Sequence, residues 1–281
     1  MNRRQFLASS IASVTALGEP LPLKIGHRQV NMMAEPSLAV FELAHRISGL
    51  SGVELHVILK ERSLWDRQTA LSYKREANRW GLRVPSLSGV WTPEASLTKP
   101  AGREHCLRKA IETAELLGAS VVLVSALRAN CPRMDDEASY VPAVETLRKM
   151  APVAADVGVT LGLETSLSTA DIKKLVDLVN HPAVRVFWDF DNLEFYGHKG
   201  QSVAGVDLLG VERVCQVHCK NEDRLLAEPG RVDWAAAFAA LKRIGYENWY
   251  VFETKHSSPE QCVEATRKNI EFMRRCLARN S

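Results

Sequence analysis

The sequence lacks the signals that define nucleotide-binding, nucleic-acid-binding or membrane-spanning proteins. Its first predicted strand runs into KIGHRQ and not into the GxGxxG turn of dinucleotide-binding folds. No apolar run reaches the roughly 18 residues that span a bilayer, so stable membrane insertion is not expected. Basic and acidic residues are mixed, the formal net charge is only +3, and no basic block indicates a nucleic-acid partner.

Cysteines are few and show no zinc-finger or redox spacing. The chain has 6 cysteines and no CxxC pair. Cys215 and Cys219 are predicted on one face of a strand, opposite to the face that carries His218. Most of the cysteines are expected to be buried small apolar residues. Their number would also suit an oxidising compartment, and a disulfide stays open at this point.

The first 20 residues differ from the rest of the chain. Paired arginines in NRRQFLA precede an Ala/Ser-rich, weakly apolar stretch from Phe6 to Leu17, which contains the small residues VTA as a cleavage site. This order resembles a twin-arginine export signal, and a basic N-terminal helix is the alternative. The resemblance implies periplasmic or other export of an already folded protein. We therefore separate residues 1–20 from a predicted domain over residues 21–281.

From residue 21 onward, short apolar runs alternate with helical patterns. The strand-like runs are LKIGH, VELHVIL, LRVPSLSG, SVVLVSA, VTLGLE, VRVFWD, VCQVHCK and WYVFE. Helices are predicted after most of them, including one over 103–117 that ends at Gly118 and one over 169–179. Regular alternation over eight units predicts a single-domain α/β protein with the (β/α)8 TIM barrel fold. An open doubly wound sheet is the alternative, but it would require a glycine-rich first turn.

Four consecutive predicted strands end on a residue that can bind a metal ion. Side chains alternate along a strand with period two, and barrel active sites form at the C-terminal ends of the strands. If the relevant faces point inward, the four side chains converge on one side of the barrel mouth. Three carboxylates and one imidazole suit Mn²⁺, Mg²⁺ or Co²⁺, with Zn²⁺ less favoured, so we expect one divalent metal ion. The expected ligands are Glu164, Asp189, His218 and Glu253.

These motifs resemble the xylose-isomerase-like barrel superfamily of sugar isomerases, ketose 3-epimerases, inosose dehydratases and endonuclease IV. The resemblance covers residues 21–277, and its carriers are LGLE, HPAVRVFWDFDN, VHCKN, the VDW helix start and GYENWYVFE. It implies that the four residues above are the metal ligands. It also implies that Glu164 and Glu253 exchange protons with the substrate.

Three positions bear on how far the resemblance extends to the substrate. Many relatives carry His three residues after the strand-six Asp, where this chain has Asn192. Some epimerases carry a second Glu where this chain has Ala170, whereas the Arg found six positions after the strand-seven His is present as Arg224. The substrate and its stereochemistry therefore stay open.

The predicted function is a metal-dependent sugar isomerase or epimerase that removes a proton next to a carbonyl and passes through an enediolate. Glu164 and Glu253 would remove the proton and return it on the opposite face. Lys220 and Arg224 would neutralise developing oxyanions. For two tryptophans the alternative is core packing, and for His256 it is a surface loop position. The residues predicted to line the sugar pocket are His27, Trp91, Trp188, Asn192 and His256.

Other functions remain open in the sequence. The same enediolate could expel a leaving group, which would give a dehydratase or lyase on a keto-sugar or 3-keto-glycoside. A phosphodiesterase like endonuclease IV would need histidines on further strands, where this chain has Ser86, Ser88 and Ser125. A non-catalytic barrel would bind a sugar without turnover. A small sugar is the expected partner, and a homo-oligomer is compatible with the sequence.

Overall fold

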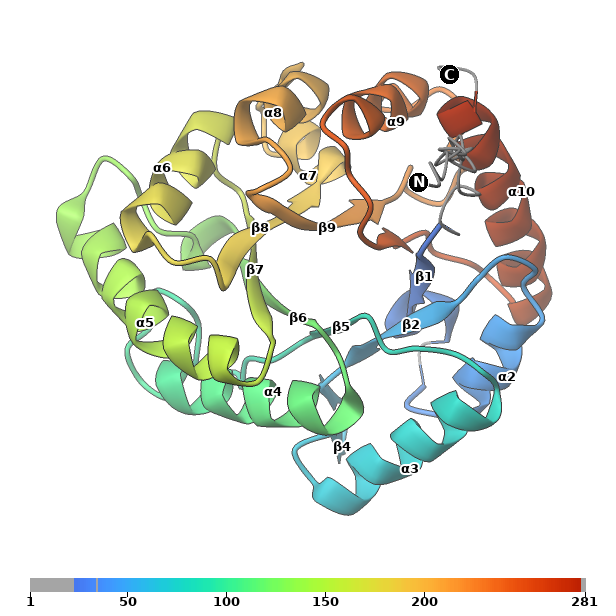
Figure 1. Cartoon of the computed structure of the whole chain (residues 1–281), viewed down its shortest axis with the longest axis horizontal. Coiled ribbons are helices and arrows are strands. Elements are labelled where there is room, and N and C mark those ends of the chain that lie inside the picture. The colour runs from blue at the N-terminus through green and yellow to red at the C-terminus, as the bar shows by residue number, and fades with distance from the viewer. Residues whose placement is uncertain (1–22, 34, 279–281) are drawn as a thin grey trace, which may run out of the picture.

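The fold is a closed barrel of parallel strands surrounded by helices (Figure 1). The computed structural model describes residues 23–33 and 35–278, and the predicted export signal over residues 1–20 lies outside them. Around the barrel the strands follow the order β1-β10-β9-β8-β7-β6-β5-β2. Each strand neighbours the next barrel strand in sequence, and β1 closes the ring against β10. The predicted single-domain (β/α)8 TIM barrel is confirmed.

The barrel strands are short, with three to six residues each. They are β1 (Ile25–Arg28), β2 (Gly52–His56), β5 (Ser86–Ser88), β6 (Val121–Ala126), β7 (Thr160–Thr165), β8 (Val184–Asp189), β9 (Val214–Cys219) and β10 (Tyr250–Phe252). A small antiparallel hairpin of β3 (Ile58–Leu59) and β4 (Arg62–Ser63) follows β2.

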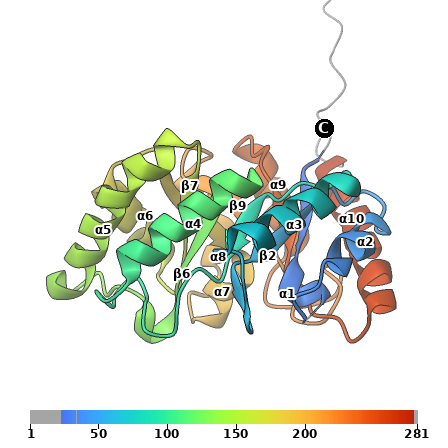
Figure 2. The same cartoon turned by 90° about the horizontal axis from the view of Figure 1, so that it is seen from below.

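Helices α3, α4 and α5 lie across the outside of the barrel in the side view (Figure 2). The helices are α1 (Gln29–Met32), α2 (Ala39–His45), α3 (Arg67–Arg79), α4 (Arg103–Leu117), α5 (Glu137–Asp156), α6 (Thr169–Val179), α7 (Phe190–Phe195), α8 (Gln201–Leu209), α9 (Trp234–Arg243) and α10 (Pro259–Ala278). The bounds of α4 and α6 are those predicted from the sequence. Two helices that the sequence analysis did not identify, α7 and α8, connect β8 to β9.

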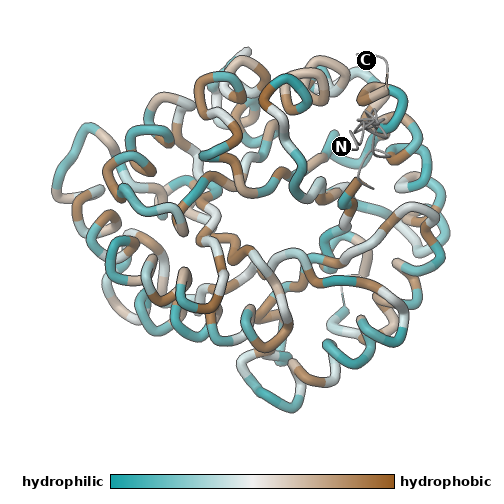
Figure 3. Tube along the Cα trace, viewed as in Figure 1, coloured by the Kyte–Doolittle hydropathy of each residue, from teal (hydrophilic) through white to brown (hydrophobic). Residues whose placement is uncertain are grey.

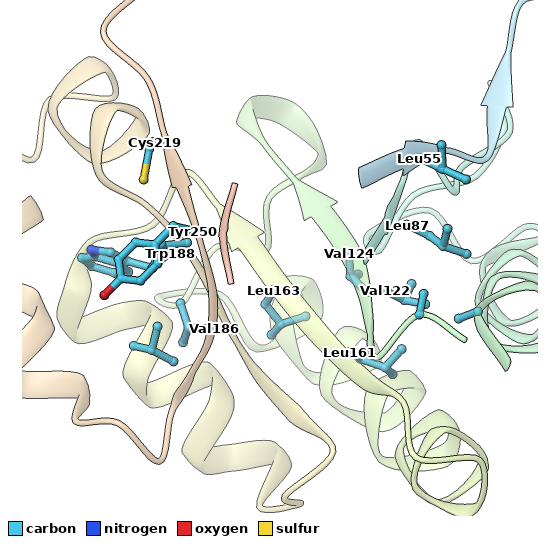
Figure 4. Close-up of a cluster of buried hydrophobic side chains, with 14 of the residues drawn as sticks. Leu55, Leu87, Val122, Val124, Leu161, Leu163, Val186, Trp188, Cys219 and Tyr250 are labelled. Atoms are coloured by element: carbon cyan, nitrogen blue, oxygen red, sulfur yellow. The ribbon is translucent and has the colours of Figure 1, made fainter. Parts of the chain in front are cut away.

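An apolar layer between the strands and the helices forms the main core. Hydrophobic residues concentrate on the strands and on the inner sides of the helices, with hydrophilic residues outside (Figure 3). Figure 4 shows part of this layer, made by alternate residues of successive strands such as Leu161 and Leu163. Trp188 belongs to it as well, since it is 1% exposed and its Nε1 donates to the carbonyl of Ser202 at 3.1 Å. The prediction that Trp188 lines the sugar pocket is therefore wrong.

The strand faces that point away from the helices line the barrel interior. On β9 a bulge changes which residues lie on that inner face. The pairing of β8 with β9 passes from Val186–Val214 to Phe187–Gln216, which leaves Cys215 as an extra residue. Cys215 therefore joins an interior apolar cluster with Phe187, and does not lie on the face predicted from strict alternation. No disulfide joins the cysteines within the described residues, and five of them are buried, as expected for small apolar side chains.

None of the helices in residues 23–33 and 35–278 has both the length and the apolar character needed to cross a bilayer.

Candidate metal centre

The four predicted ligands meet at the C-terminal end of the barrel. They are carried by the ends of β7, β8, β9 and β10, which are neighbours in the ring. Asp189 lies opposite His218 in the register of β8 and β9, and Glu253 directly follows β10. One ligand atom from each of Glu164, Asp189, His218 and Glu253 lies within 4.8 Å of all the others. The alternation of side chains thus brings together residues that are 25 to 89 positions apart in sequence.

His218 is the centre of this group and is fully buried. Its Nδ1 lies 3.3 Å from Glu164 Oε1, 3.4 Å from Glu253 Oε2 and 3.7 Å from Asp189 Oδ2. Its other ring nitrogen, Nε2, lies 3.3 Å from Glu54 Oε2. The imidazole therefore directs one nitrogen toward the three predicted ligands and the other toward a carboxylate behind it. This is the arrangement found around metal-binding histidines, in which a carboxylate accepts the remaining N–H.

Glu54 is a residue of the candidate centre that the sequence analysis missed. It lies on β2 and is fully buried. Its Oε2 accepts a hydrogen bond from the Ser86 hydroxyl at 2.7 Å, and its Oε1 lies 3.2 Å from Arg28 Nε. Burial acts to raise the pKa of Glu54, but the charges of His218 and Arg28 outweigh it and lower the pKa to about 2. The sequence does contain a sign of this position: Glu54 is an acidic residue inside the apolar run VELHVIL, and a buried charge requires a partner.

Arg28 also belongs to the site, and its position corrects a prediction about His27. The strand β1 extends one residue further than expected, so Arg28 is its inward-facing tip and pairs with Glu54 and Glu253. His27 lies on the opposite face of β1, and its Nε2 is 3.2 Å from Nε2 of His256. Both histidines were predicted to line the sugar pocket. The structure instead packs them against each other outside the group of four.

Lys220 and Asn192 lie directly at the candidate centre, where the sequence analysis placed them. Lys220 Nζ is 2.6 Å from Asp189 Oδ2, 2.9 Å from Glu253 Oε2 and 3.0 Å from Asn192 Oδ1. Asn192 Nδ2 donates to Glu164 Oε1 at 3.2 Å. Burial acts to lower the pKa of Lys220, but Asp189 and Glu253 raise it well above its ordinary value, so the ammonium stays charged.

The remaining two predicted pocket residues lie further from His218. Trp91 is half-buried, and its Nε1 donates to the carbonyl of Ser125, the residue opposite Glu164 in the register of β6 and β7. This places Trp91 at the edge of the barrel mouth. Arg224 donates to Glu222 and to the carbonyl of Pro229, both at 2.8 Å and both within its own loop. The structure does not bring Arg224 to the group of four.

The charges of the site fit a divalent cation. Burial raises the pKa of Glu164, whereas the opposing charges around Glu253 outweigh the effect of burial and lower its pKa. Burial alone would lower the pKa of His218, but the surrounding carboxylates raise it well above its ordinary value. A cation bound at Nδ1 would displace the imidazole proton, and four carboxylates would then face two cationic side chains, which leaves two negative charges for the cation to balance. These groups are Glu54, Glu164, Asp189 and Glu253 on one side and Arg28 and Lys220 on the other.

The fold and this site define the class of protein, and comparison with known families agrees. The profile of the xylose isomerase-like TIM barrel family matches residues 41–276, and the chain belongs to this family. It is 28% identical over 206 residues to an L-ribulose 3-epimerase from Methylomonas sp. (strain DH-1), a match that covers 68% of this chain and 70% of that protein.

Solved structures of sugar epimerases share the fold at low sequence identity. A D-psicose 3-epimerase from Clostridium cellulolyticum H10, in complex with D-tagatose, superposes with a TM-score of 0.75 and 15% identity, covering 91% of this chain and 99% of that chain. A 3-keto-D-glucoside 4-epimerase from E. coli gives a TM-score of 0.72 and 17% identity, covering 90% of this chain and 100% of that chain.

Proposed function

We propose that this protein is a divalent-metal-dependent sugar isomerase or epimerase. The observation that carries the proposal is the pair of carboxylates on either side of one imidazole. Glu164 Oε1 and Glu253 Oε2 lie 3.3 and 3.4 Å from the same nitrogen of His218 and come from strands β7 and β10, on either side of β9 along the ring. A substrate bound in front of this imidazole would have a carboxylate on each side. Membership of the xylose isomerase-like family and the epimerase relatives support the same reading.

Glu164, Asp189, His218 and Glu253 would hold the ion, and their oxygen-rich donor set suits Mn²⁺, Mg²⁺ or Co²⁺. Once bound, such an ion polarises a sugar carbonyl and the neighbouring hydroxyl, which acidifies the C–H between them.

Glu164 and Glu253 would carry out the proton transfer. One carboxylate would remove the proton from the carbon next to the carbonyl, and the other would return a proton on the opposite face. Asn192 donates to Glu164 Oε1 and thereby fixes the orientation of that carboxylate. Lys220 lies between Glu253 and Asn192, where its ammonium can donate to a substrate oxygen that gains negative charge.

We further propose an unphosphorylated ketose or keto-glycoside as the substrate. The two cationic side chains that border the group of four, Arg28 and Lys220, are both engaged with its carboxylates. A phosphate at this position would have to compete with those carboxylates for Arg28 and Lys220. An exported enzyme would also meet free sugars more readily than phosphorylated ones, in keeping with the N-terminal signal predicted from the sequence.

Turnover in deuterated water tests the proposal. Purified protein with Mn²⁺ is incubated with L-ribulose, D-allulose, D-tagatose and a 3-keto-glucoside, and the products are analysed by NMR. We expect an epimeric or isomeric product that carries solvent deuterium at the carbon next to the carbonyl. Glu164→Gln and Glu253→Gln should each lower kcat by about 10²-fold or more, the usual contribution of a general acid–base residue. Glu222→Gln, a matched change in an exposed loop, should leave kcat unchanged.

Two outcomes would contradict the epimerase proposal in different ways. An unsaturated ketone that absorbs in the ultraviolet would identify elimination, as in the dehydratase or lyase alternative. Sugar binding without deuterium exchange on any tested sugar would indicate a non-catalytic barrel.

A further inference from the structure

A second group of metal-binding side chains lies on the outer side of β1, apart from the candidate metal centre. It consists of His27 from β1, His256 from the loop after β10, and Cys262 from the first turn of α10. One ligand atom from each lies within 4.8 Å of the other two. We propose that these three residues form a second metal site for a borderline ion such as Zn²⁺. This inference is independent of the proposed epimerase activity.

The orientation of His27 supports a ligand role for its Nε2. Its Nδ1 lies 3.2 Å from the backbone carbonyl oxygen of Arg28, which can only accept a hydrogen bond. Nδ1 therefore carries the proton in the neutral ring, and the lone pair is on Nε2, the atom that faces His256. A backbone carbonyl that fixes the tautomer in this way is the usual support of a metal-binding histidine.

The spacing of the two imidazoles fits a shared ion. The two Nε2 atoms are 3.2 Å apart. Two nitrogens bound to one tetrahedral Zn²⁺ at the usual bond length lie about 3.4 Å apart. The same spacing suits a hydrogen bond between two neutral imidazoles, so the distance alone does not distinguish the two states. The thiol of Cys262 favours the shared ion, because it places a third possible ligand atom within 4.8 Å of a nitrogen of each ring.

Burial and charge agree with a site that binds neutral imidazoles and a thiolate. His27 and Cys262 are fully buried, whereas His256 is half-buried and gives an ion a path from solvent. Burial lowers the pKa of His27 to about 3 and that of His256 to about 4, so both rings are neutral at pH 7. Burial also raises the pKa of Cys262 to about 11, so an ion would have to displace the thiol proton on binding.

The two sites would select different ions because their donor atoms differ. Two imidazoles and a thiolate favour Zn²⁺ and other borderline or soft ions, whereas the carboxylate-rich centre favours hard ions such as Mn²⁺. An ion at the second site would also link β1 to the loop that leaves Glu253 and to the start of α10. We therefore assign it a structural role next to the barrel mouth, holding that loop in place.

Absorption spectroscopy with Co²⁺ tests the second site. A cysteine thiolate bound to Co²⁺ gives a strong near-ultraviolet charge-transfer band, which an oxygen-rich centre without sulfur cannot produce. Titration of the full-length protein with two equivalents of Co²⁺ should produce this band in the wild type and in His218→Ala. Cys262→Ser should abolish it. Cys276→Ser, which changes another buried cysteine of α10, should retain it.

A second variant and elemental analysis complete the test. His256→Gln changes the half-buried ligand in the loop and should also remove the band, while circular dichroism confirms that the variants are folded. Protein purified with Zn²⁺ present should hold one ion fewer per chain in Cys262→Ser than in the wild type. No thiolate band in the wild type, or a band that survives in Cys262→Ser, would overturn the second site and leave His27 and His256 as a hydrogen-bonded pair. Because His218→Ala removes the first site alone, failure of the epimerase proposal is distinguishable from failure of this one.

Discussion

Glu54 holds the imidazole of His218 from the side opposite to the other carboxylates. Its Oε2 lies 3.3 Å from His218 Nε2, and the Ser86 hydroxyl and the Arg28 guanidinium fix the carboxylate in turn. An imidazole that donates its Nε2–H to Glu54 presents the lone pair of Nδ1 to Glu164 and Glu253. Glu54 is thus a positioning residue for the candidate centre, since it acts through His218.

Glu54→Gln should weaken Mn²⁺ binding without removing any of the four predicted ligands. The amide keeps the shape of the side chain but lacks the negative charge that orients and polarises the imidazole. We expect about a 10- to 100-fold loss of affinity, the usual effect of changing such a partner, measured by isothermal titration calorimetry. Ser86→Ala, which removes the hydrogen bond to Glu54 and the one accepted from Gln216 but leaves the Glu54 charge in place, should have a smaller effect. Equal affinity in Glu54→Gln and the wild type would contradict this role.

His56, at the end of β2, predicts a dependence of stability on pH. Burial, followed by the charge of Arg28, lowers its pKa from 6.5 to about 4. As the pH falls below 6.5, the unfolded chain takes up a proton at His56 before the folded protein does. The stability contributed by the neutral ring is therefore present above pH 6.5 and is lost as the pH falls toward 4.

His56→Asn should flatten this part of the pH profile. We expect the free energy of unfolding to fall less steeply between pH 6.5 and 4 in the variant, by at most about 1.4 kcal/mol per pH unit. Urea unfolding at several pH values measures the slope, and the difference at pH 8 isolates the cost of lost packing. Parallel profiles for the variant and the wild type would show that His56 titrates alike in the folded and unfolded states.

At the scale of the strands, β7 depends on a glycine where it approaches the bulge of β9. A Cβ atom at Gly162 would lie 2.9 Å from Cys215 Sγ and 3.2 Å from Phe187 Cβ. Gly162→Ala should therefore destabilise the barrel by about 1–3 kcal/mol, as overpacking of a core usually does. Gly26→Ala on β1 is the matched control, because its Cβ would have no neighbour closer than 3.4 Å.

Thermal unfolding of the two variants measures this difference. Adding Cys215→Ala removes the closest contact, so Gly162→Ala should cost less in the Cys215→Ala background than in the wild type. If Gly162→Ala and Gly26→Ala lower the Tm equally, steric contact with the bulge is not the reason for glycine at this position.

Strand periodicity predicted most of the candidate centre. Glu164, Asp189, His218 and Glu253 each end an apolar run, where a polar residue that continues the inward face is visible in the sequence. The first two strands, near Arg28 and Glu54, were identified. Periodicity, however, shows which face of a strand a residue occupies and does not show which residues of other strands lie beside it. The partners of Glu54 come from β1, β5 and β9, and only closure of the ring makes β2 and the non-adjacent β9 face the same interior.

Small irregularities account for the predictions that were wrong. Because β1 is one residue longer than expected, Arg28 and not His27 lies at the barrel mouth. Successive residues of a strand point to opposite faces of the sheet, so one extra residue changes which side chain points inward. The bulge at Cys215 alters the face of one residue for the same reason. Both depend on pairing with a neighbouring strand, so neither is visible in the local pattern of apolar and polar residues.

In the whole molecule, both groups of candidate metal ligands reach the seam where the first and last strands pair, the four-residue group through Glu253 and the second group through His27 and His256. β1 and β10 meet in the register Ile25–Tyr250 and His27–Phe252, which closes the barrel. Across this seam, Arg28 pairs with Glu253 inside the barrel, and His27 contacts His256 outside it. The polar contacts that build the two groups therefore also join the N-terminal strand to the C-terminal part of the chain.

Filling the candidate centre should accordingly stabilise the whole barrel. Its four predicted ligands come from four strands and are far apart in the unfolded chain. The ion therefore binds the folded protein in preference to the unfolded chain. Saturation with Mn²⁺ at 100 times its Kd would add about 2.7 kcal/mol to the free energy of unfolding, which corresponds to a rise in Tm of about 5 °C for a chain of this size. Differential scanning calorimetry with Mn²⁺ and after EDTA treatment measures the shift. His218→Ala should abolish the response to Mn²⁺, whereas Cys262→Ser should retain it. An equal shift in the wild type and in His218→Ala would place the stabilising ion somewhere other than at the ends of β7–β10.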